Sequence, residues 1–310
     1  MSMLSNSYFH DEAKAFEFLE SVLWKDGPVC PHCGGMERIT KVKANKAKRI
    51  RLGLWRCGPC KRQFTVKVGT VFEHARLPLN KALQAAYLMT SSKKGISAHQ
   101  LHRTLEVTYR TAWFLAHRIR EAMREGALAP FGLNGGAVEV DETYIGHRKG
   151  AGKPKGGWGH KMTVLGLVDR STGRSRLFHV EKGGPQIHAI VLGNLAREAR
   201  LMTDEHTMYK KIGREFAEHS AVHHYNKEYV RGDVTTNTVE GSFSIFKRGF
   251  KGIYQHCAEK HLHRYLAEYE FRYSNREAIG INDGARSVRA LEGIVGKRLT
   301  YRDSSMRVAA

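Results

Sequence analysis

The segment VEVDETYIG, residues 138–146, alternates apolar and acidic residues and is followed by a glycine-rich basic loop that carries no acid. This alternation predicts a strand whose two valines lie on one face and whose Glu139 and Asp141 lie on the other. A carboxylate near the end of such a strand is either an ordinary turn former or a ligand for a hard cation. The elements around Asp141 must decide between these two interpretations.

The second pattern whose residue types could do chemistry is a pair of cysteine motifs, CPHC at residues 30–33 and CGPC at residues 57–60. The two motifs are separated by 23 residues. Two-residue spacing lets both thiolates of a pair reach one tetrahedral ion at ~2.3 Å, and four thiolates close a structural zinc site. A thioredoxin-like redox pair is the alternative, but no βαβ pattern surrounds either pair. We therefore expect one Zn²⁺ ion bound by Cys30, Cys33, Cys57 and Cys60.

The charge balance points to a polyanionic partner. Lysine and arginine number 51 against 30 acids, which gives a formal net charge of +21. Such an excess favours nucleic acid. No run of 18 apolar residues exists and the N-terminus lacks the pattern of a signal peptide, so a membrane protein is not expected. Five cysteines, an odd number, fit metal binding in a reducing cytoplasm better than a disulfide framework.

Residues 76–130 have the pattern of a helix-turn-helix. Ser97 can cap a short helix, the tripeptide EVT can form a tight turn, and Thr108 can cap a longer second helix. That second helix would present Tyr109 and Arg110 to DNA. A plain helical hairpin within a larger core gives the same periodicity, but the basic composition favours DNA binding.

From Gly135 the pattern changes to short strands. Three strands come in succession, and helices and strands then alternate in the order βββαβαβα, which is the order of a ribonuclease H-like mixed α/β fold. In such a sheet, sites lie outside the carboxyl ends of the parallel strands. Asp204 follows the strand RLMT at such an end, and Asp141 is near the end of the strand expected beside it.

The third carboxylate should come from the last helix of this fold, which offers Glu240. Lys247 follows Glu240 by seven residues, just under two helical turns, so the two side chains share a helix face about 10 Å apart. That arrangement places a cation beside the carboxylate, where a DNA phosphate would pass. Taken singly, each acid is more easily explained as a cap or a surface charge, and the joint placement is what favours a site.

The segments VDETYIG, TDEHTMY and NTVEGSFSIFKRGFKGIY resemble the three catalytic segments of DDE transposases, and more narrowly those of bacterial insertion-sequence transposases with an N-terminal zinc ribbon. The resemblance extends from Cys30 to about Arg276, and its motifs are specific together rather than singly. It implies that Asp141, Asp204 and Glu240 form the acidic triad, with Lys247 as the associated basic residue. Some relatives use asparagine as the third residue, and Asn237 lies one turn before Glu240. A neutral amide is a poorer ligand for Mg²⁺, so we favour Glu240.

The resemblance also implies the chemistry. Three carboxylates can hold two Mg²⁺ or Mn²⁺ ions ~4 Å apart, one activating the attacking oxygen and one stabilising the leaving 3′-oxygen. The enzyme would cleave the ends of its insertion element and join the 3′-hydroxyls to target DNA. The implied partners are double-stranded DNA at the element ends and at the target, and further copies of the chain assembled on that DNA. The implied location is the cytoplasm, at the bacterial nucleoid.

Other acids and the basic loop receive different interpretations. Glu139, Glu142 and Glu205 are neighbours of the triad that we do not assign to it, and Glu142 falls on the opposite strand face from Asp141. Asp233, in an expected loop, is likewise left out. The segment GHRKGAGKPKGGWGHK, residues 146–161, lacks the spacing of a phosphate loop. We expect Lys153 and Lys155 in it to contact DNA backbone, although a basic loop without that role is an equal alternative.

These patterns predict four regions: a zinc ribbon with an N-terminal helix (1–75), a helix-turn-helix (76–130), a ribonuclease H-like catalytic domain (134–280) and a C-terminal tail (281–310). Two competing functions remain open from the sequence. A transcription regulator would bind DNA without nicking it, and a ribonuclease H-like nuclease would cut DNA without strand transfer.

Overall fold

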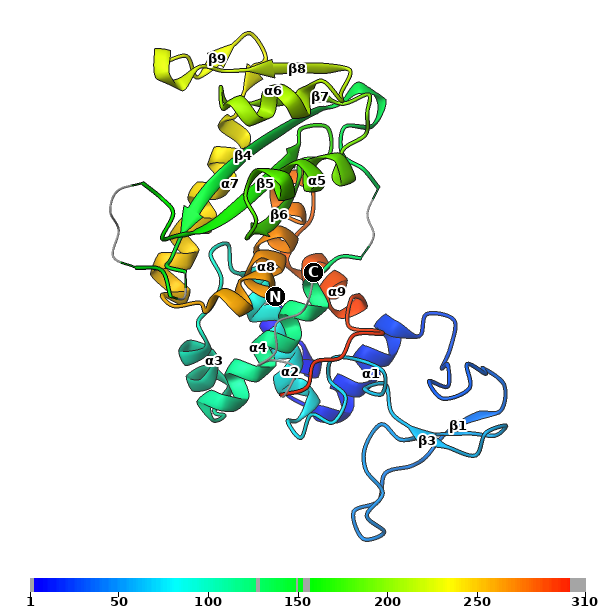
Figure 1. Cartoon of the computed structure of the whole chain (residues 1–310). Coiled ribbons are helices and arrows are strands. Elements are labelled where there is room, and N and C mark those ends of the chain that lie inside the picture. Colours follow the sequence, from blue (N-terminus) through cyan, green and yellow to red (C-terminus); the bar gives the residue numbers. More distant parts are fainter. Residues whose placement is uncertain (1–2, 127–128, 149, 153–156, 302–310) are drawn as a thin grey trace. The chain divides into compact units, whose positions relative to one another are not determined.

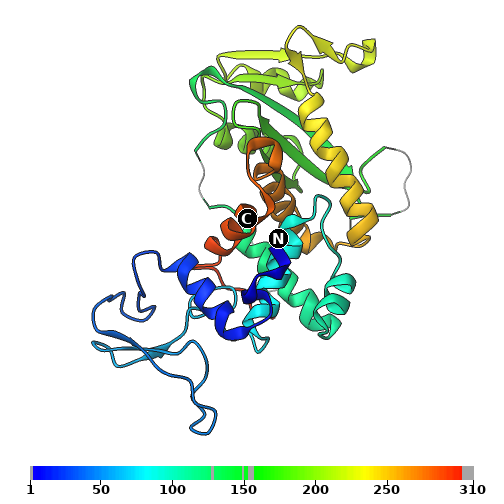
Figure 2. The same ribbon diagram turned by 180° about the vertical axis from the view of Figure 1, so that it is seen from behind.

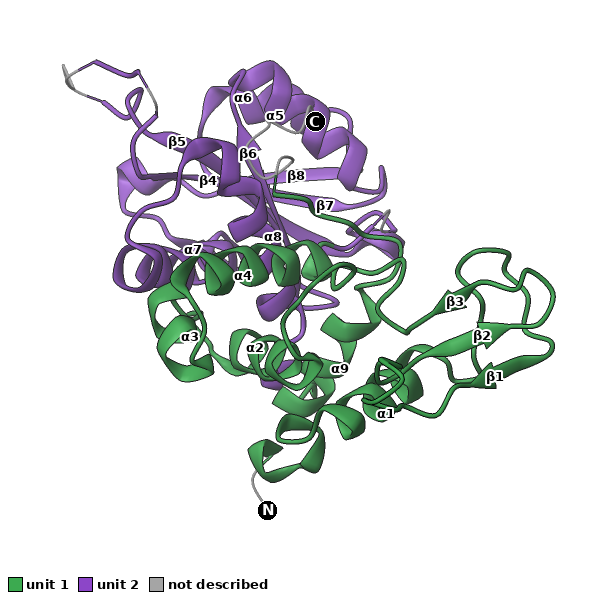
Figure 3. Cartoon of the chain, turned by 90° about the horizontal axis from the view of Figure 1, so that it is seen from below, with its two compact units in different colours: residues 1–124, 280–306 green, residues 125–279, 307–310 purple. Residues whose placement is uncertain are grey.

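The structure is a computed structural model that describes residues 3–126, 129–148, 150–152 and 157–301 (Figures 1 and 2). The chain folds into two compact units (Figure 3). The first contains the residues up to Arg124 together with those from Gly280, and the second contains Glu125–Ile279. Among the described residues, no helix is long and apolar enough to cross a membrane.

The first unit begins with a helix that is joined to a small sheet. Two short turns, η1 (Met3–Ser5) and η2 (Ser7–Phe9), lead into α1 (Glu12–Leu23), where the Asp11 carboxylate caps the helix by accepting from the Lys14 N–H. The antiparallel sheet consists of β1 (Ile39–Lys41), β2 (Trp55–Cys57) and β3 (Gln63–Phe64). Glu20 of α1 accepts hydrogen bonds from the Trp55 indole and the Lys41 ammonium, and thereby ties the helix to this sheet.

The remainder of the first unit is helical: α2 (Leu79–Ser91), α3 (Ala98–Leu105), α4 (Tyr109–Met123) and α9 (Asp283–Glu292). Ser97 and Thr108 cap α3 and α4, as the sequence predicts. Three residues, with Glu106 in the left-handed conformation, join these two helices. The region 281–310, predicted as a C-terminal tail, contains α9, whose buried Arg286 donates to the Thr90 carbonyl of α2.

The second unit is built on a five-stranded mixed sheet in the order β6-β5-β4-β7-β8. Its strands are β4 (Ala137–Ile145), β5 (Met162–Asp169), β6 (Arg174–Val180), β7 (Arg200–Thr203) and β8 (Glu218–Ala221). The first three pair antiparallel, whereas β7 runs parallel to both β4 and β8. The helices are α5 (Gly184–Asn194), α6 (Thr207–Gly213), α7 (Asn237–Gly249) and α8 (Leu262–Ser274). The strands of the five-stranded sheet and the helices α5, α6 and α7 therefore follow the predicted order βββαβαβα.

Short elements complete this unit. A hairpin of β9 (Val230–Arg231) and β10 (Val234–Thr235), which the sequence did not suggest, precedes α7. Single turns are η3 (Leu133–Gly135), η4 (His224–Asn226), η6 (Glu259–His261) and η7 (Glu277–Ile279), and a π-helical turn η5 (Phe250–Tyr254) extends α7.

Helices cover both faces of the five-stranded sheet (Figures 1 and 2). On one face, Val138 and Val140 of β4 belong to a core with residues of α5 and α6. On the other, alternate strand residues such as Val164 pack with α7 and α8. Because the side chains of a strand alternate between its faces, Glu139 and Asp141 lie on the α7 side.

A glycine lets α7 approach the sheet closely. Gly166 of β5 pairs with Asp141 across the antiparallel ladder. A Cβ atom at this position would lie 2.6 Å from the ring of Phe243 and 3.1 Å from Val239, both on α7. The absence of a side chain at Gly166 therefore allows α7 to pack directly over the part of the sheet that holds Asp141.

Candidate functional site

Asp141 lies near the end of its strand, as the sequence predicts, and β4 continues for four residues to Ile145. The parallel pairing between β4 and β7 ends close to Asp141. Its last aligned pair is Glu139 of β4 with Met202 of β7. Asp141 therefore lies two positions beyond that pair, on the α7 side of the sheet. The side chain is half-buried.

Asp204 directly follows β7, which ends at Thr203. Continuing the parallel register of β4 and β7 by two residues places Asp204 opposite Asp141. The Asp204 carboxylate accepts a hydrogen bond from the His206 N–H at 3.0 Å, so it also caps the turn into α6. The hydrogen bond from His206 thus orients the Asp204 side chain, and the strand register places Asp204 next to Asp141.

Glu240 lies in the first turn of α7. Its Oε1 atom accepts from the Thr236 hydroxyl at 2.7 Å and lies 3.7 Å from the Nε2 atom of His224. The Glu240 side chain is 40% exposed, so one side of it remains open to solvent. Asn237, the alternative third residue, is exposed at the start of the same helix.

Glu139 has a structural role that the sequence did not reveal. Its carboxylate is fully buried and accepts from the N–H groups of Thr238 and Val239 at 2.8 and 2.9 Å. It also accepts from the Thr238 hydroxyl at 2.7 Å and from Arg170 at 2.6 Å. A strand residue two positions before Asp141 therefore caps the helix that carries Glu240.

Burial and mutual repulsion change the proton affinity of this cluster. Burial, together with the charges of the Asp204 and Glu240 carboxylates, raises the pKa of Asp141 to about 7, whereas the Glu142 N–H and His224 act to lower it. Burial, together with the charges of Asp141 and Asp204, raises the pKa of Glu142 to about 8, although the Tyr209 hydroxyl opposes the shift. Asp204 and Glu240 therefore both act electrostatically on Asp141.

Glu142 is closer to the site than we expected. It lies on the opposite strand face from Asp141, as predicted, and it is adjacent to the buried hydroxyl of Tyr209 in α6. The Oε1 atom of Glu142 and the Tyr209 hydroxyl are buried without a geometrically sound hydrogen bond among the described residues.

The other acids that the sequence analysis left out of the triad make hydrogen bonds or ion pairs elsewhere. Glu205 accepts from the N–H groups of His224 and Tyr225, and Asp233 pairs with Arg200.

Lys247 lies on α7 with its charge in range of the acids, as the helix spacing predicts. Burial lowers its pKa, as do the nearby charges of Lys251 and Lys161, whereas the Asp141 and Glu240 carboxylates oppose the shift.

Among the described residues, the ligand oxygens of the triad do not all lie within 4.8 Å of one another. The arrangement is thus an open cluster rather than a closed cage for one ion.

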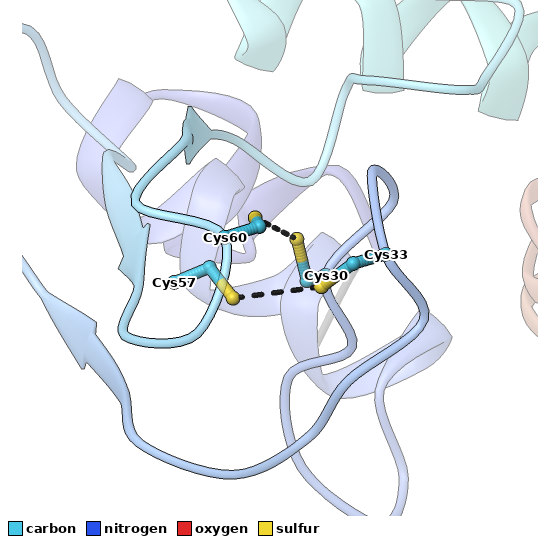
Figure 4. Close-up of side chains that lie close together, drawn as sticks. All are labelled: Cys30, Cys33, Cys57 and Cys60. Atoms are coloured by element: carbon cyan, nitrogen blue, oxygen red, sulfur yellow. Dashed lines mark hydrogen bonds between the residues drawn. The ribbon is translucent and has the colours of Figure 1, made fainter.

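The four cysteines converge in the first unit (Figure 4). The Sγ atoms of Cys30 and Cys60 are 3.7 Å apart, as are those of Cys33 and Cys57, and no disulfide joins them. Sulfurs at the corners of a tetrahedron around zinc, each ~2.3 Å from the ion, would be roughly 3.8 Å apart. The observed spacing fits a structural Zn²⁺ ion, and the four side chains form the predicted zinc-binding site.

The pKa values of these thiols are also consistent with a bound cation. Burial opposes ionisation of Cys30, but the N–H groups of His32 and Cys33 and the neighbouring thiols lower its pKa to about 7. The Cys60 N–H favours the Cys57 thiolate, yet burial and the three other thiols raise the Cys57 pKa to about 12. Four thiolates cannot form together unless a cation balances their charge.

A second group of possible ligands contains His179, Glu181 and Glu259. The Nδ1 atom of His179 lies 3.6 Å from Glu181, its Nε2 atom lies 3.7 Å from Glu259, and Arg148 lies 3.9 Å from Glu259. Both ring nitrogens therefore face carboxylates, and Arg148 adds a positive charge beside Glu259. We assign no metal to this group.

The residues expected to contact DNA are placed as follows. Tyr109 is 44% exposed at the start of α4 and stacks on His99, with ring centroids 4.4 Å apart. Arg110 is exposed and lies over the Tyr301 ring at 4.4 Å. Lys153 and Lys155 lie outside the described residues.

Comparisons with known proteins give a consistent result. Residues 133–274 match the family model described as ISXO2-like transposase domain, and residues 10–63 match the one described as transposase zinc-ribbon domain. The chain is 28% identical over 292 residues to a protein of Halobacterium salinarum named "Uncharacterized protein in transposable element ISH50". That alignment covers 87% of this chain and 93% of the relative.

The cysteine cluster yields a prediction about stability. Replacing Cys57 with serine should release the zinc and unfold the ribbon, because structural zinc supplies about 10–16 kcal/mol of apparent binding energy to such modules. Zinc content by mass spectrometry and hydrogen exchange of each unit will test this. The wild type should hold one equivalent, and the second unit should stay protected in both proteins. Less than half an equivalent in the wild type contradicts the assignment.

The acid cluster yields a prediction about pH. The pKa values of Asp141 and Glu142, about 7 and about 8, exceed those of the unfolded chain, ~4. Between the unfolded pKa values and the folded ones, the folded protein binds more protons than the unfolded chain. The free energy of unfolding therefore decreases as the pH rises from the unfolded values toward 8. Without added divalent cation, the free energy of unfolding should fall more steeply with pH in the wild type than in Asp141→Asn. Urea unfolding at several pH values measures this, and parallel profiles contradict it.

Proposed function

Because the chain belongs to the insertion-sequence transposases with an N-terminal zinc ribbon, we propose that it cleaves the ends of its element and joins the freed 3′-hydroxyls to target DNA. The observation that carries this proposal is the arrangement of Asp141, Asp204 and Glu240. They come from β4, the end of β7 and the first turn of α7, and two of them raise the pKa of the third. Such repulsion between carboxylates is relieved when cations bind between them.

Each acid has a distinct position in the proposed site. Asp141 is proposed to lie between the other two, since the charges of both act on it. Asp204 and Glu240 flank it, and each is oriented by one hydrogen bond, from the His206 N–H and from the Thr236 hydroxyl. Two Mg²⁺ or Mn²⁺ ions held by these carboxylates would supply an activated oxygen nucleophile and stabilise the leaving 3′-oxygen. The open spacing of the ligand oxygens suits a pair of ions better than one caged ion.

Lys247 is proposed to contact the DNA backbone beside the reacting phosphate. It shares a face of α7 with Glu240, and Lys251 and Lys161 add positive charge near it. Cations here favour the approach of a phosphodiester to a cluster of acids that would otherwise repel it. No protein nucleophile is needed, because water attacks in the nicking step and the 3′-hydroxyl in the joining step.

Glu240 is the preferred third acid over Asn237. The Glu240 charge acts on both Asp141 and Lys247, whereas Asn237 contributes a neutral amide at the exposed start of the helix. The capping of α7 by Glu139 further fixes the turn that carries Glu240. We propose a ribonuclease H-like fold for the whole second unit, with this triad as its active centre.

The first unit is proposed to recognise DNA. Its zinc ribbon and the α3–α4 pair, interpreted as a helix-turn-helix, would contact the element ends, with Tyr109 and Arg110 of α4 facing the bases. The net charge of +21 predicts binding that weakens steeply with salt, most of it lost by ~0.3 M. Joining two ends to one target suggests that at least two copies assemble on DNA. We propose that they act in the cytoplasm, at the nucleoid.

Substitution of the triad tests the proposed chemistry. Asp141→Asn, Asp204→Asn and Glu240→Gln are nearly isosteric, so folding and DNA binding should survive. Each removes a charged ligand and should lower Mg²⁺-dependent nicking of element ends about 10²-fold or more. Asn237→Ala should have a milder effect. Asp233→Asn serves as the matched control, since Asp233 is exposed and pairs with Arg200.

A pre-nicked element end supplied with a target plasmid separates strand transfer from simple nuclease activity. Joined products that depend on Asp141 support the transposition chemistry, and cleavage without joining supports a nuclease. Binding without any nicking supports a regulator. Near wild-type nicking and joining by Asp141→Asn in Mg²⁺ would sink the assignment of this site.

Substitution of Arg110 tests the proposed recognition helix. Arg110→Ala should reduce the preference for element ends over random DNA, because losing one good base contact costs about 1–3 kcal/mol of discrimination. Lys153→Ala, at a backbone-contacting position expected from the sequence, should weaken binding to all sequences alike. Competition binding at fixed salt measures both effects. An unchanged preference in Arg110→Ala means that another element reads the DNA.

A further inference from the structure

A pocket of about 250 Å³ opens in the second unit. It lies between the end of β4, the loop before β5 and the end of α7. Tyr144 and Trp158 contribute aromatic surface, and Lys161, Lys247 and Lys251 contribute three positive charges. None of the side chains lining this pocket is acidic. The chemistry therefore suits a ligand that combines a flat ring with negative charge.

The two aromatic rings are arranged as a stacking surface. Their centroids are 5.7 Å apart with an angle of 11° between the planes. Trp158 is 56% exposed and Tyr144 is 37% exposed, so the pair is open to solvent rather than packed in a core. The Lys161 Nζ atom lies 4.1 Å from the centroid of the Trp158 ring. Tryptophan is enriched at binding interfaces, which favours a binding role for this exposed ring.

Backbone hydrogen bonds hold the pair in place. The Lys161 N–H donates to the Trp158 carbonyl at 2.8 Å, and the Arg148 N–H donates to the His160 carbonyl at 2.9 Å. Tyr144 is fixed by its position on β4, where it pairs with Thr163 of β5. The stacking surface is thus preformed by the strand and by the base of the loop.

The pocket lies about 10 Å from the acids along both elements that carry them, since Tyr144 is three residues beyond Asp141 on β4 and Lys247 is seven residues beyond Glu240 on α7. Lys247 lines the pocket and is also within electrostatic range of Asp141 and Glu240. Burial raises the pKa of Tyr144, and the charges of Glu142, Asp141 and Asp204 add to this shift. A DNA strand whose phosphate reached the acids would therefore pass this aromatic surface.

We propose that the pocket holds one unpaired nucleobase of the DNA, stacked on Trp158 and Tyr144, next to the phosphate that is cut. The proposal rests on the proposed function, which brings DNA to the acids. The pocket is smaller than the ~300–1,000 Å³ of sites for drug-sized ligands, so one base fits better than a free dinucleotide. The three lysines argue against an apolar peptide. Unpairing one base costs a few kcal/mol, which stacking can offset.

Binding of short duplexes without added divalent cation tests this proposal in the full zinc-loaded chain. One duplex ends in two unpaired thymidines, and its matched control ends in two abasic residues that keep the phosphates and lack the bases. The wild type should bind the thymidine duplex at least about 5-fold more tightly than the abasic duplex. Any duplex sequence serves, because stacking does not depend on base identity.

Protein variants then locate the effect. Trp158→Ala should abolish the preference for thymidine, Trp158→Phe should keep most of it, and Tyr225→Ala, at an exposed aromatic outside the pocket, should leave it unchanged. Lys161→Ala should weaken binding of both duplexes. Equal affinity of the wild type for the two duplexes, or a preference that survives in Trp158→Ala, overturns the proposal. Asp141→Asn should retain the preference for thymidine. The binding assay therefore tests the base-binding pocket independently of the proposed catalytic role of Asp141.

Discussion

Carboxylates brought together at the end of a parallel strand pair repel one another, and the second unit is organised to hold them in spite of that repulsion. Asp141 and Asp204 face each other across neighbouring strands, and Glu240 approaches from α7. The cost is visible in the pKa of Asp141, which burial and its two neighbours raise to about 7. Rigid supports are therefore required for the cluster to exist before any cation is bound.

Those supports come from residues that have no part in the proposed chemistry. Glu139 fixes the start of α7 by accepting two backbone hydrogen bonds, and Arg170 neutralises it. Gly166, paired with Asp141, leaves room for Phe243 and so lets α7 lie directly on the sheet. Glu205 holds the turn that brings His224 near Glu240. The position of Glu240 thus depends on two other acids, Glu139 and Glu205, that the sequence does not distinguish from it.

The elements of the second unit could be predicted because their signals are local. The alternation around Asp141 and the apolar run before Asp204 gave β4 and β7 nearly to the residue. The cysteine spacing likewise predicted the cluster of four sulfurs. The family resemblance rested on short motifs, and the matches to transposase and zinc-ribbon family models agree with it.

Features set by long-range packing could not be predicted. Glu139 and Asp141 are two acids on one face of one strand, and only the position of α7 gives the first a capping role. The sequence did not indicate that the antiparallel partner β5 pairs with β4 well beyond the last residue paired with the parallel partner β7. Helix α9 was missed because its stability depends on packing against α2, residues far away in the chain. The stacking of Tyr144 on Trp158 joins a strand to a loop and has no sequence signal.

The central claim is that Asp141, Asp204 and Glu240 together bind the divalent cations of the reaction. An anomalous difference map of crystals grown with Mn²⁺ and DNA tests it most directly. The account predicts peaks between Asp141 and Asp204 and beside Glu240, with carboxylate oxygens as the protein ligands and a phosphate oxygen completing the shell. Peaks confined to other acids, such as Glu142 or the group around His179, or peaks ligated by Asn237 in place of Glu240, would contradict it.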